Sequence, residues 1–314
     1  MNHAPSQTVG RQGHNRSPIW AVILSVAATG LGHIYCGRLL KGLVLFFVGF
    51  AFAPIIVLFA QNAGSTLMLA LVIASLLLLA GIFVYALIDA GLLARKTGPD
   101  YQLKEYNRWY IYLLFIVVAL AYPTNLASSI RENVLQPFKI PSQAMAPSIL
   151  RGDRILLNKA IYKIKAPQRG DVVVFLNPDD RRLYFMKRIV AMPGDTIEIR
   201  DNKILINDQP LSYKNLAPMP AMNFDPGGSV RALEEDNNGR RYPILIDNAR
   251  PITMPRTLVP HGSCFVLGDN RSHSKDSRTF GPIPLADVKG RVDYIYWPAL
   301  SWLRFGKFEG AGRK

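Results

Sequence analysis

The first 130 residues of this 314-residue chain are dominated by long apolar runs, which restrict the folds that the chain can adopt. Each run is close to the roughly 20 residues that cross the hydrocarbon core of a bilayer as a helix. The runs cover residues 19–37, 43–60, 67–94 and 110–130. We therefore expect a multi-helix membrane region over residues 18–94 and a transmembrane anchor helix over residues 110–130.

The composition favours a membrane protein over a nucleic-acid-binding protein. A net charge of +15 suits either nucleic acid or an anionic membrane surface. Only 19% of the residues are charged, however, and 49% are hydrophobic. The positive charge then carries information about topology, because Lys and Arg collect in the cytoplasmic loops of membrane proteins. We expect the lipid bilayer as a partner and no nucleic acid; the oligomeric state is not set by the sequence.

The charges of three loops predict a consistent orientation. The loop at 95–109 carries four Lys and Arg residues and should be cytoplasmic. The loop at 38–42 carries two and should lie on the same side, whereas the loop at 61–66 carries no charge and should face the opposite side. This alternation places everything after residue 130 outside the cytoplasm.

The first apolar run is the weakest candidate for a membrane span, because the sequence TGLGH interrupts it. If this run spans the membrane, the polar N-terminal tail at 1–17 lies outside the cytoplasm. Arg11 and Arg16 in that tail argue against this orientation. The alternative is a segment that dips into the membrane and returns to the side from which it came.

The stretch GLGHIYCGRLLKG at 30–42 resembles the short motif of the two-helix TM2-type membrane module, with its glycine-rich turn and its tyrosine. We expect His33 and Tyr35 to be anchors at the membrane interface, where amphipathic rings favour the headgroup level. Asp89 lies near the cytoplasmic end of its run, so we expect a solvated carboxylate there. The alternative for Asp89 is a polar pathway through the membrane.

From Arg131 onward the pattern changes to short apolar stretches between Gly, Pro and Asp turns. Stretches such as DVVVFLN, DTIEIR and SCFVLGD are typical of β-strands. We expect an all-β domain over residues 131–314, in which the Pro-, Asn- and Gly-rich stretch at about 205–257 is an inserted β subdomain. Cys36 and Cys264 lie in different regions, so no disulfide is expected, and no Cys/His cluster has the spacing of a metal site.

Two polar motifs of this domain could carry chemistry. In FMKRIV, strand alternation puts Lys187 on the face opposite Arg188, so we expect one of the two cations to point inward. Burial lowers the pKa of a lysine, and a neutral lysine can act as a general base. In SHSKDSR, Asp276 and Arg278 can pair, and Ser274 could bond an amine nearby. Taken alone, the first motif also fits a surface lysine on a strand, and the second also fits a polar surface loop.

Four sequence boxes follow one another in the domain: PSQAMAPSIL, RGDVVVF, MKRIVAMPGD and GDNRSHSKDSR. In this order after a membrane helix, they resemble the boxes of type I signal peptidases, which are membrane-bound serine proteases. The resemblance implies a protein of the bacterial cytoplasmic membrane whose all-β catalytic domain lies on the extracytoplasmic side. It implies removal of N-terminal signal peptides from exported preproteins by Ser/Lys-dyad endoproteolysis. It also implies secretory preproteins with A-x-A-type cleavage sites as partners, and no cofactor or metal.

The resemblance also implies roles for individual residues. Lys187 matches the general base, and Ser142 matches the serine that forms the oxyanion hole together with the backbone N–H of position 144. Ser274 matches a serine that orients the lysine amine. The matches in supporting positions are Met145, Asp276 and Arg278.

The chain departs from the family at one position, because the nucleophilic serine falls on Ala144. Alanine has no oxygen with which to form an acyl-enzyme, so we expect the chain as written to be inactive. Three explanations are open: an engineered Ser→Ala substitution, a natural pseudoprotease that binds signal peptides or a membrane partner, and a rewired site. A rewired site would use Ser142 or Ser148 as the nucleophile.

Two further interpretations concern the ends of the chain. The principal function could lie in the first three membrane segments, as in a small transporter or an assembly platform. The aromatic residues at the other end could be part of the core or could form a rim that enters lipid beside the site. These residues are Trp297, Trp302 and Phe305.

Overall fold

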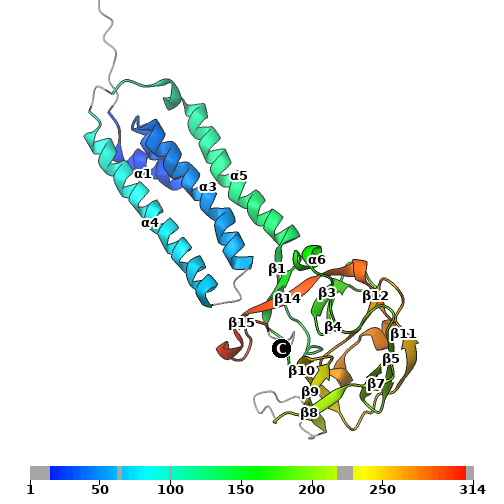
Figure 1. Ribbon diagram of the computed structural model, residues 1–314. Coiled ribbons are helices and arrows are strands. Elements are labelled where there is room, and N and C mark those ends of the chain that lie inside the picture. The colour runs from blue at the N-terminus through cyan, green and yellow to red at the C-terminus, as the bar shows by residue number, and fades with distance from the viewer. Residues whose placement is uncertain (1–14, 62–65, 99–100, 218–228, 309–314) are drawn as a thin grey trace, which may run out of the picture. The chain divides into compact units, whose positions relative to one another are not determined.

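The computed structural model describes residues 15–61, 66–98, 101–217 and 229–308 (Figure 1). The chain divides into two compact units, Met1–Ser128 and Ser129–Lys314. The first unit is helical, and the second consists mostly of β-strands. The expected order of helices followed by a β domain is confirmed.

The main helices of the first unit follow the predicted apolar runs. Two of them contain stretches long and apolar enough to cross a membrane, Ala70–Lys96 and Trp109–Asn133. Their outward-facing side chains are large hydrophobic residues, which suits a lipid environment. The helices are α1 (Pro18–Ala27), α2 (Leu31–Tyr35), α3 (Leu39–Gln61), α4 (Thr66–Lys96) and α5 (Trp109–Asn133), with a 3₁₀ turn η1 (Glu105–Asn107) before α5.

The first apolar run does not form one continuous helix over residues 19–37 but is divided into α1 and α2. Helix α1 has ten residues, and at about 1.5 Å per residue it covers only half of the hydrocarbon core. Gly30 then adopts a left-handed conformation, with φ of 90°, and reverses the chain into α2. The backbone N–H of Ser17, before α1, donates to the Tyr35 hydroxyl at the end of α2 at 3.3 Å. The segment therefore returns to the end from which it started, as the alternative expected.

Glycines explain the tight packing of this returning segment. A Cβ on Gly30 would overlap the carbonyl oxygen of Gly42, and a Cβ on Gly32 would overlap that of Ala21. Only glycine allows backbones to approach so closely. The glycines of the 30–42 stretch thus let α1, α2 and α3 touch.

His33 is fully buried and is not an interfacial anchor, contrary to the expectation. Its Nε2 lies 2.7 Å from Asp89 Oδ2 on α4, and Lys41 Nζ on α3 lies 2.8 Å from the same oxygen. Asp89 is therefore held by two partners rather than by solvent alone. The three side chains come from α2, α3 and α4, so this trio links three helices.

The main sheet of the second unit has eight strands, which pair antiparallel in the order β1-β2-β14-β3-β4-β12-β13, with β15 on β14. The strands are β1 (Leu135–Lys139), β2 (Arg154–Asn158), β3 (Val172–Leu176), β4 (Tyr184–Ala191), β12 (Ser263–Leu267), β13 (Ile283–Pro284), β14 (Val288–Trp297) and β15 (Gly306–Lys307). Cys264, on β12, and Cys36 are both buried free thiols.

Two smaller sheets occupy the stretch predicted as an insert. One has the order β11-β5-β6-β7, and it begins before the predicted insert because β5 precedes residue 205. The other has the order β10-β9-β8. Residues 218–228 of the predicted insert lie outside the described residues. The strands are β5 (Thr196–Arg200), β6 (Lys203–Ile206), β7 (Gln209–Pro210), β8 (Ser212–Asn215), β9 (Val230–Asn237), β10 (Arg240–Asp247) and β11 (Met254–Leu258).

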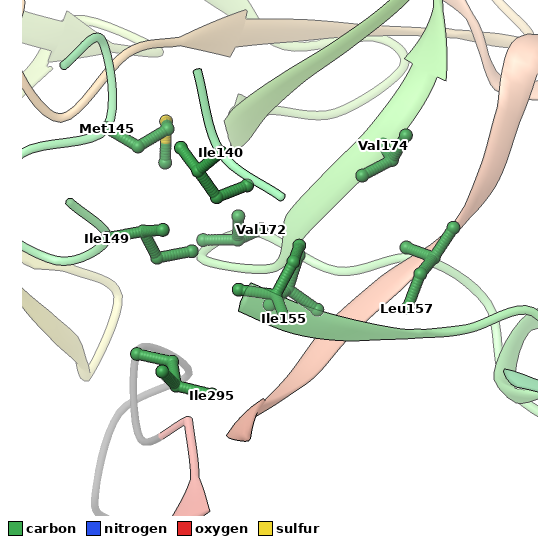
Figure 2. Packing of buried hydrophobic residues seen from close by; sticks show 9 residues of the cluster. Ile140, Met145, Ile149, Ile155, Leu157, Val172, Val174 and Ile295 are labelled. Carbon is green, nitrogen blue, oxygen red and sulfur yellow. The ribbon is translucent and has the colours of Figure 1, made fainter. Parts of the chain in front are cut away.

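Apolar side chains cover the main sheet on both faces. Val172 and Val174 of β3 belong to a cluster that also contains Met145 and Ile149 (Figure 2). Val173 of the same strand belongs to a different cluster on the opposite face. Strand β4 pairs with β3 and is itself buried from Lys187 to Ala191. Short helical turns complete the unit: α6 (Ile161–Ile164), η2 (Arg271–His273), α7 (Ser277–Phe280), η3 (Leu285–Asp287) and η4 (Trp302–Arg304).

Candidate active site

Lys187 lies on β4 opposite Val173 of β3, and its side chain is only 6% exposed. Burial lowers the pKa of its amine to about 8, although the carboxylates of Asp276 and Asp269 oppose this effect. Within the part of the chain that the structure describes, the amine forms no hydrogen bond or salt bridge. Its Nζ lies over the Phe185 ring, 5.7 Å from the ring centroid. The predicted inward-facing lysine is therefore present.

Arg188 is also buried, so the expectation that only one of these two adjacent cations points inward is incorrect. Its guanidinium forms two hydrogen bonds with Asp269, at 2.7 and 2.6 Å. It also donates to the Gly170 carbonyl at 2.7 Å and lies over the Tyr242 ring, 4.0 Å from its centroid. Alternation did put the two side chains on opposite faces, but both faces are covered.

The segment after β1 brings three candidate residues to Lys187. Ser142, Ala144 and Met145 line one groove together with Lys187, with a volume of about 640 Å³. Ser142 is exposed at the groove, Ala144 is half-buried, and Met145 is buried. Met145 packs against Ile140 and Ile149 beneath the segment, as the sequence predicted (Figure 2). Position 144 thus shares a groove with the buried amine.

A loop from Gly268 to Arg278, which we name the catalytic loop, docks on the backbone of Ala144. The Asn270 N–H donates to the Ala144 carbonyl at 3.1 Å, and the Asn270 side-chain amide donates to the Gln143 carbonyl at 3.3 Å. A Cβ on Gly268 would collide with the Ser274 hydroxyl and crowd the Ala144 carbonyl oxygen. The absence of a side chain at Gly268 therefore lets the loop close on the segment that carries position 144.

The predicted Asp276–Arg278 pair is present and braces this loop. Arg278 Nε and Nη2 each donate to Asp276 at 2.7 Å, and the Gly268 N–H donates to the same carboxylate at 2.9 Å. Asp276 also accepts from the Arg278 N–H at the start of α7. One fully buried carboxylate thus fixes both ends of the loop.

The expected hydrogen bond between Ser274 and Lys187 is not formed. The Ser274 Oγ is buried and has no hydrogen-bond partner among the described residues, because its side chain packs against Gly268 rather than lining the groove. A buried hydroxyl without a partner costs free energy. The Ser274 hydroxyl, which lies next to Gly268 as the Ala144 carbonyl oxygen does, could therefore form a further hydrogen bond.

Comparisons with known proteins identify the family of this chain. A family model described as signal peptidase, peptidase S26, matches residues 108–297. This chain belongs to that family. The signal peptidase I of Pseudomonas fluorescens is 31% identical over 230 residues, which are 65% of this chain and 76% of that protein. The signal peptidase I of Aquifex aeolicus is 31% identical over 199 residues, which are 54% of this chain and 78% of that protein.

In this member of the signal peptidase family, Ser148 does not fit the role of a substitute nucleophile. Its hydroxyl accepts from Arg188 Nη2 at 3.2 Å and donates to the Pro243 carbonyl at 3.3 Å. Ser148 does not line the groove that contains Lys187. The alternative of a site rewired through Ser148 is therefore contradicted, whereas Ser142 lies in the groove.

Sequence reasoning gave no role to Gly268, Asp269 or Asn270, although all three belong to the GDNR box of the signal peptidase family. A glycine beside turn-forming residues signals a close backbone approach, and this signal could have indicated the docking. The Arg188–Asp269 pair joins positions 81 apart in the chain, so no local pattern reveals it.

The aromatic residues near the end of the described chain are not core residues. The exposed fractions are 54% for Trp297, 62% for Trp302 and 47% for Phe305. Their rings contact one another, with centroids 5.1 Å apart for the two tryptophans and 6.0 Å for Trp302 and Phe305. An exposed aromatic cluster of this kind suits a membrane interface or a binding partner.

Proposed function

We propose that the groove binds the signal peptide of an exported preprotein, and that Lys187 is the general base for a serine at position 144. With Ala144 in that position, the chain binds signal peptides without cleaving them. The observation that carries this proposal is the buried amine of Lys187, which has no salt bridge among the described residues and opens into the same groove as the Ala144 methyl group.

The reaction of the serine form follows from the groups around the groove. The neutral amine of Lys187 takes the proton of the serine hydroxyl that A144S introduces, and the oxygen attacks the carbonyl carbon of the last small residue of an A-x-A site. The Ser142 hydroxyl and the N–H of position 144 donate to the resulting oxyanion, a stabilisation of roughly 3–4 kcal/mol per donor in comparable proteases. The protonated Lys187 then gives its proton to the leaving amine.

Deacylation uses the same base. Lys187, neutral again, removes a proton from a water molecule, whose oxygen attacks the acyl-enzyme ester and releases the signal peptide as a carboxylic acid. The serine oxygen regains its proton from Lys187. The Ser274 hydroxyl, which has no partner among the described residues, is available to orient the amine during these transfers, and Asp276 with Arg278 keeps the loop behind it in place.

Contacts within the helical unit support the expected orientation in the membrane. The Tyr106 hydroxyl donates to the Gly37 carbonyl at 2.8 Å, and the Arg16 guanidinium lies between the rings of Tyr35 and Tyr101. The residue before the start of α1, the start of α3 and the described residues 101–106 of the next loop therefore share one end of the unit. Because these segments are rich in Lys and Arg, we infer that this end is cytoplasmic and that the β unit is extracytoplasmic.

The first experiment compares the chain as it stands with its A144S variant in detergent. Each is incubated with a secretory preprotein that carries an A-x-A site, and mature product is followed by gel and mass spectrometry. We expect product only from A144S, and binding of the signal peptide by both. A144S combined with K187M is the control and should be inactive.

The other outcomes separate the alternatives. Cleavage by the chain with Ala144 would contradict the proposal and point to Ser142 as the nucleophile. If A144S binds the signal peptide but does not cleave it, the domain is a binding module, and deletion of residues 1–108 would then test whether the principal function lies in the helical unit.

A further inference from the structure

Glu235, on strand β9 of the inserted sheet, forms a buried ion pair with the catalytic loop. It is fully buried, and Arg271 at the other side of the pair is 5% exposed. Arg271 Nη1 and Nη2 donate to the two carboxylate oxygens of Glu235, each at 2.7 Å. Such a two-fold geometry fixes the orientation of both groups, and neither charge can be satisfied by solvent.

The ion pair leads to position 144 in two further contacts. Arg271 Nε also donates to the Gly268 carbonyl at 3.2 Å. Gly268 in turn packs against Ser274 and the Ala144 carbonyl, which a side chain at this position would displace. The position of Gly268 thus depends on the Arg271 guanidinium, whose orientation is fixed by Glu235 of the inserted sheet.

Strand β10, which pairs with β9, holds the same loop through its backbone. The Leu245 N–H donates to the Asp269 carbonyl at 2.8 Å, and the Asp247 N–H donates to the Ser272 hydroxyl at 2.9 Å. Tyr242 of β10 donates to Glu235 at 2.7 Å and carries the Arg188 guanidinium over its ring. The insert therefore contacts both the catalytic loop and the strand that bears Lys187.

We propose that the β9–β10 hairpin positions the catalytic loop through Glu235, so that Glu235 and Arg271 are positioning residues for the centre formed by Lys187 and position 144. The catalytic consequence rests on the function proposed above, whereas the structural consequence does not. The inserted subdomain is then part of the catalytic apparatus rather than an appendage.

The structural consequence is tested on the full chain with Ala144, in detergent, by hydrogen–deuterium exchange with mass spectrometry. We expect E235Q to speed exchange about tenfold in peptides covering 268–276 and 142–146, with strands β3 and β4 unchanged. The matched control is D236N in the same hairpin, because Asp236 pairs with the exposed Arg241 and, among the described residues, forms no hydrogen bond or salt bridge with the catalytic loop. Unchanged exchange at 268–276, or an equal increase throughout the unit, would overturn the proposal.

A second variant distinguishes the loss of loop positioning from a general loss of folding. E235Q leaves Arg271 as a buried charge without its partner, whereas E235Q/R271Q replaces the ion pair by two amides that can bond each other. We expect the double variant to melt close to the parent chain and still to show faster exchange at 268–276, because the contact with Gly268 is lost. Parental protection of the loop in the double variant would contradict the positioning role.

The catalytic consequence is measured in the A144S background. We expect E235Q/R271Q to lower kcat about 100-fold, the scale of a small misplacement of catalytic groups, with KM unchanged within about twofold. E235D, which keeps the charge, should retain more activity than the double variant. A raised KM with an unchanged kcat would show instead that the hairpin contacts substrate. If A144S itself does not cleave, the proposed function fails, and the exchange experiment still decides this inference.

Discussion

Lys187 and Arg188 are adjacent on β4 and are both buried, yet their surroundings differ in kind. The Arg188 guanidinium contacts the Asp269 carboxylate, the Gly170 carbonyl and the Tyr242 ring. Lys187 faces the groove, where its amine lies over the Phe185 ring but has no hydrogen-bond or salt-bridge partner in the part of the chain that the structure describes. A buried cation with a full set of partners is structural, whereas one without partners has a lowered pKa and is available for proton transfer.

The largest expected effect is on activity at the groove. In the A144S background, K187M should lower kcat by about four orders of magnitude, because removing one member of a catalytic unit costs nearly as much as removing all of it. K187R should be equally inactive, since a guanidinium stays protonated. The assay is preprotein cleavage, with signal-peptide binding as the control. Substantial activity in K187M would remove Lys187 from the mechanism.

The second effect contrasts the two cations in stability. R188M should lower the free energy of unfolding of the chain with Ala144 by about 3–5 kcal/mol, because it leaves the buried Asp269 without its partner. K187M should not lower it, because this variant removes the desolvation cost of a buried cation. Chemical unfolding monitored by circular dichroism compares the two. A similar loss in both variants would show that Lys187 has a structural partner after all.

The pH dependence of stability sharpens the same contrast. The pKa of Lys187 is about 8 in the folded chain, against 10.5 for an ordinary lysine. Between these pH values the unfolded chain binds more protons than the folded chain does. The contribution of Lys187 to the free energy of unfolding therefore increases by about 3 kcal/mol in total as the pH rises from about 8 to 10.5. The measurement is the difference between parent and K187M unfolding curves across this range. A difference that does not change with pH would contradict the lowered pKa.

The smallest of these effects concerns the docking of the catalytic loop. In the A144S background, G268A should lower kcat about 10- to 100-fold, because its methyl group would collide with Ser274 and displace the loop from position 144. G262A is the control, because a Cβ on Gly262 meets no atom within 4 Å, although its positive φ adds backbone strain. Equal activity of G268A and the parent would show that the loop tolerates this displacement.

The residues that sequence predicted best are those whose chemistry and local pattern coincide. Lys187 stood in an alternating strand, so its orientation could be predicted without knowing the rest of the fold, whereas the place of Met145 was implied only by the family resemblance. Alternation could not show that both faces of β4 are covered, because that depends on clusters from distant strands. The burial of Arg188 and its pairing with Asp269 could therefore not be predicted.

The helical unit shows a related limit. Hydropathy found the apolar run at 19–37, but a run of apolar residues does not tell whether the chain crosses a membrane or turns back within it. The turn depends on the left-handed Gly30 and on its close approach to Gly42. The bond of His33 to Asp89 likewise joins residues far apart in sequence, and hydropathy alone does not contain it.

The most direct test of the account is a titration of the Lys187 side chain in the chain with Ala144. Selective ¹³C labelling of lysine, with K187M to assign the signal, allows the Cε chemical shift to be followed by NMR from about pH 6 to about pH 11. We expect a midpoint of about 8. A midpoint near the ordinary lysine value of 10.5 would mean that the amine is solvated or paired, and that Lys187 is not the base.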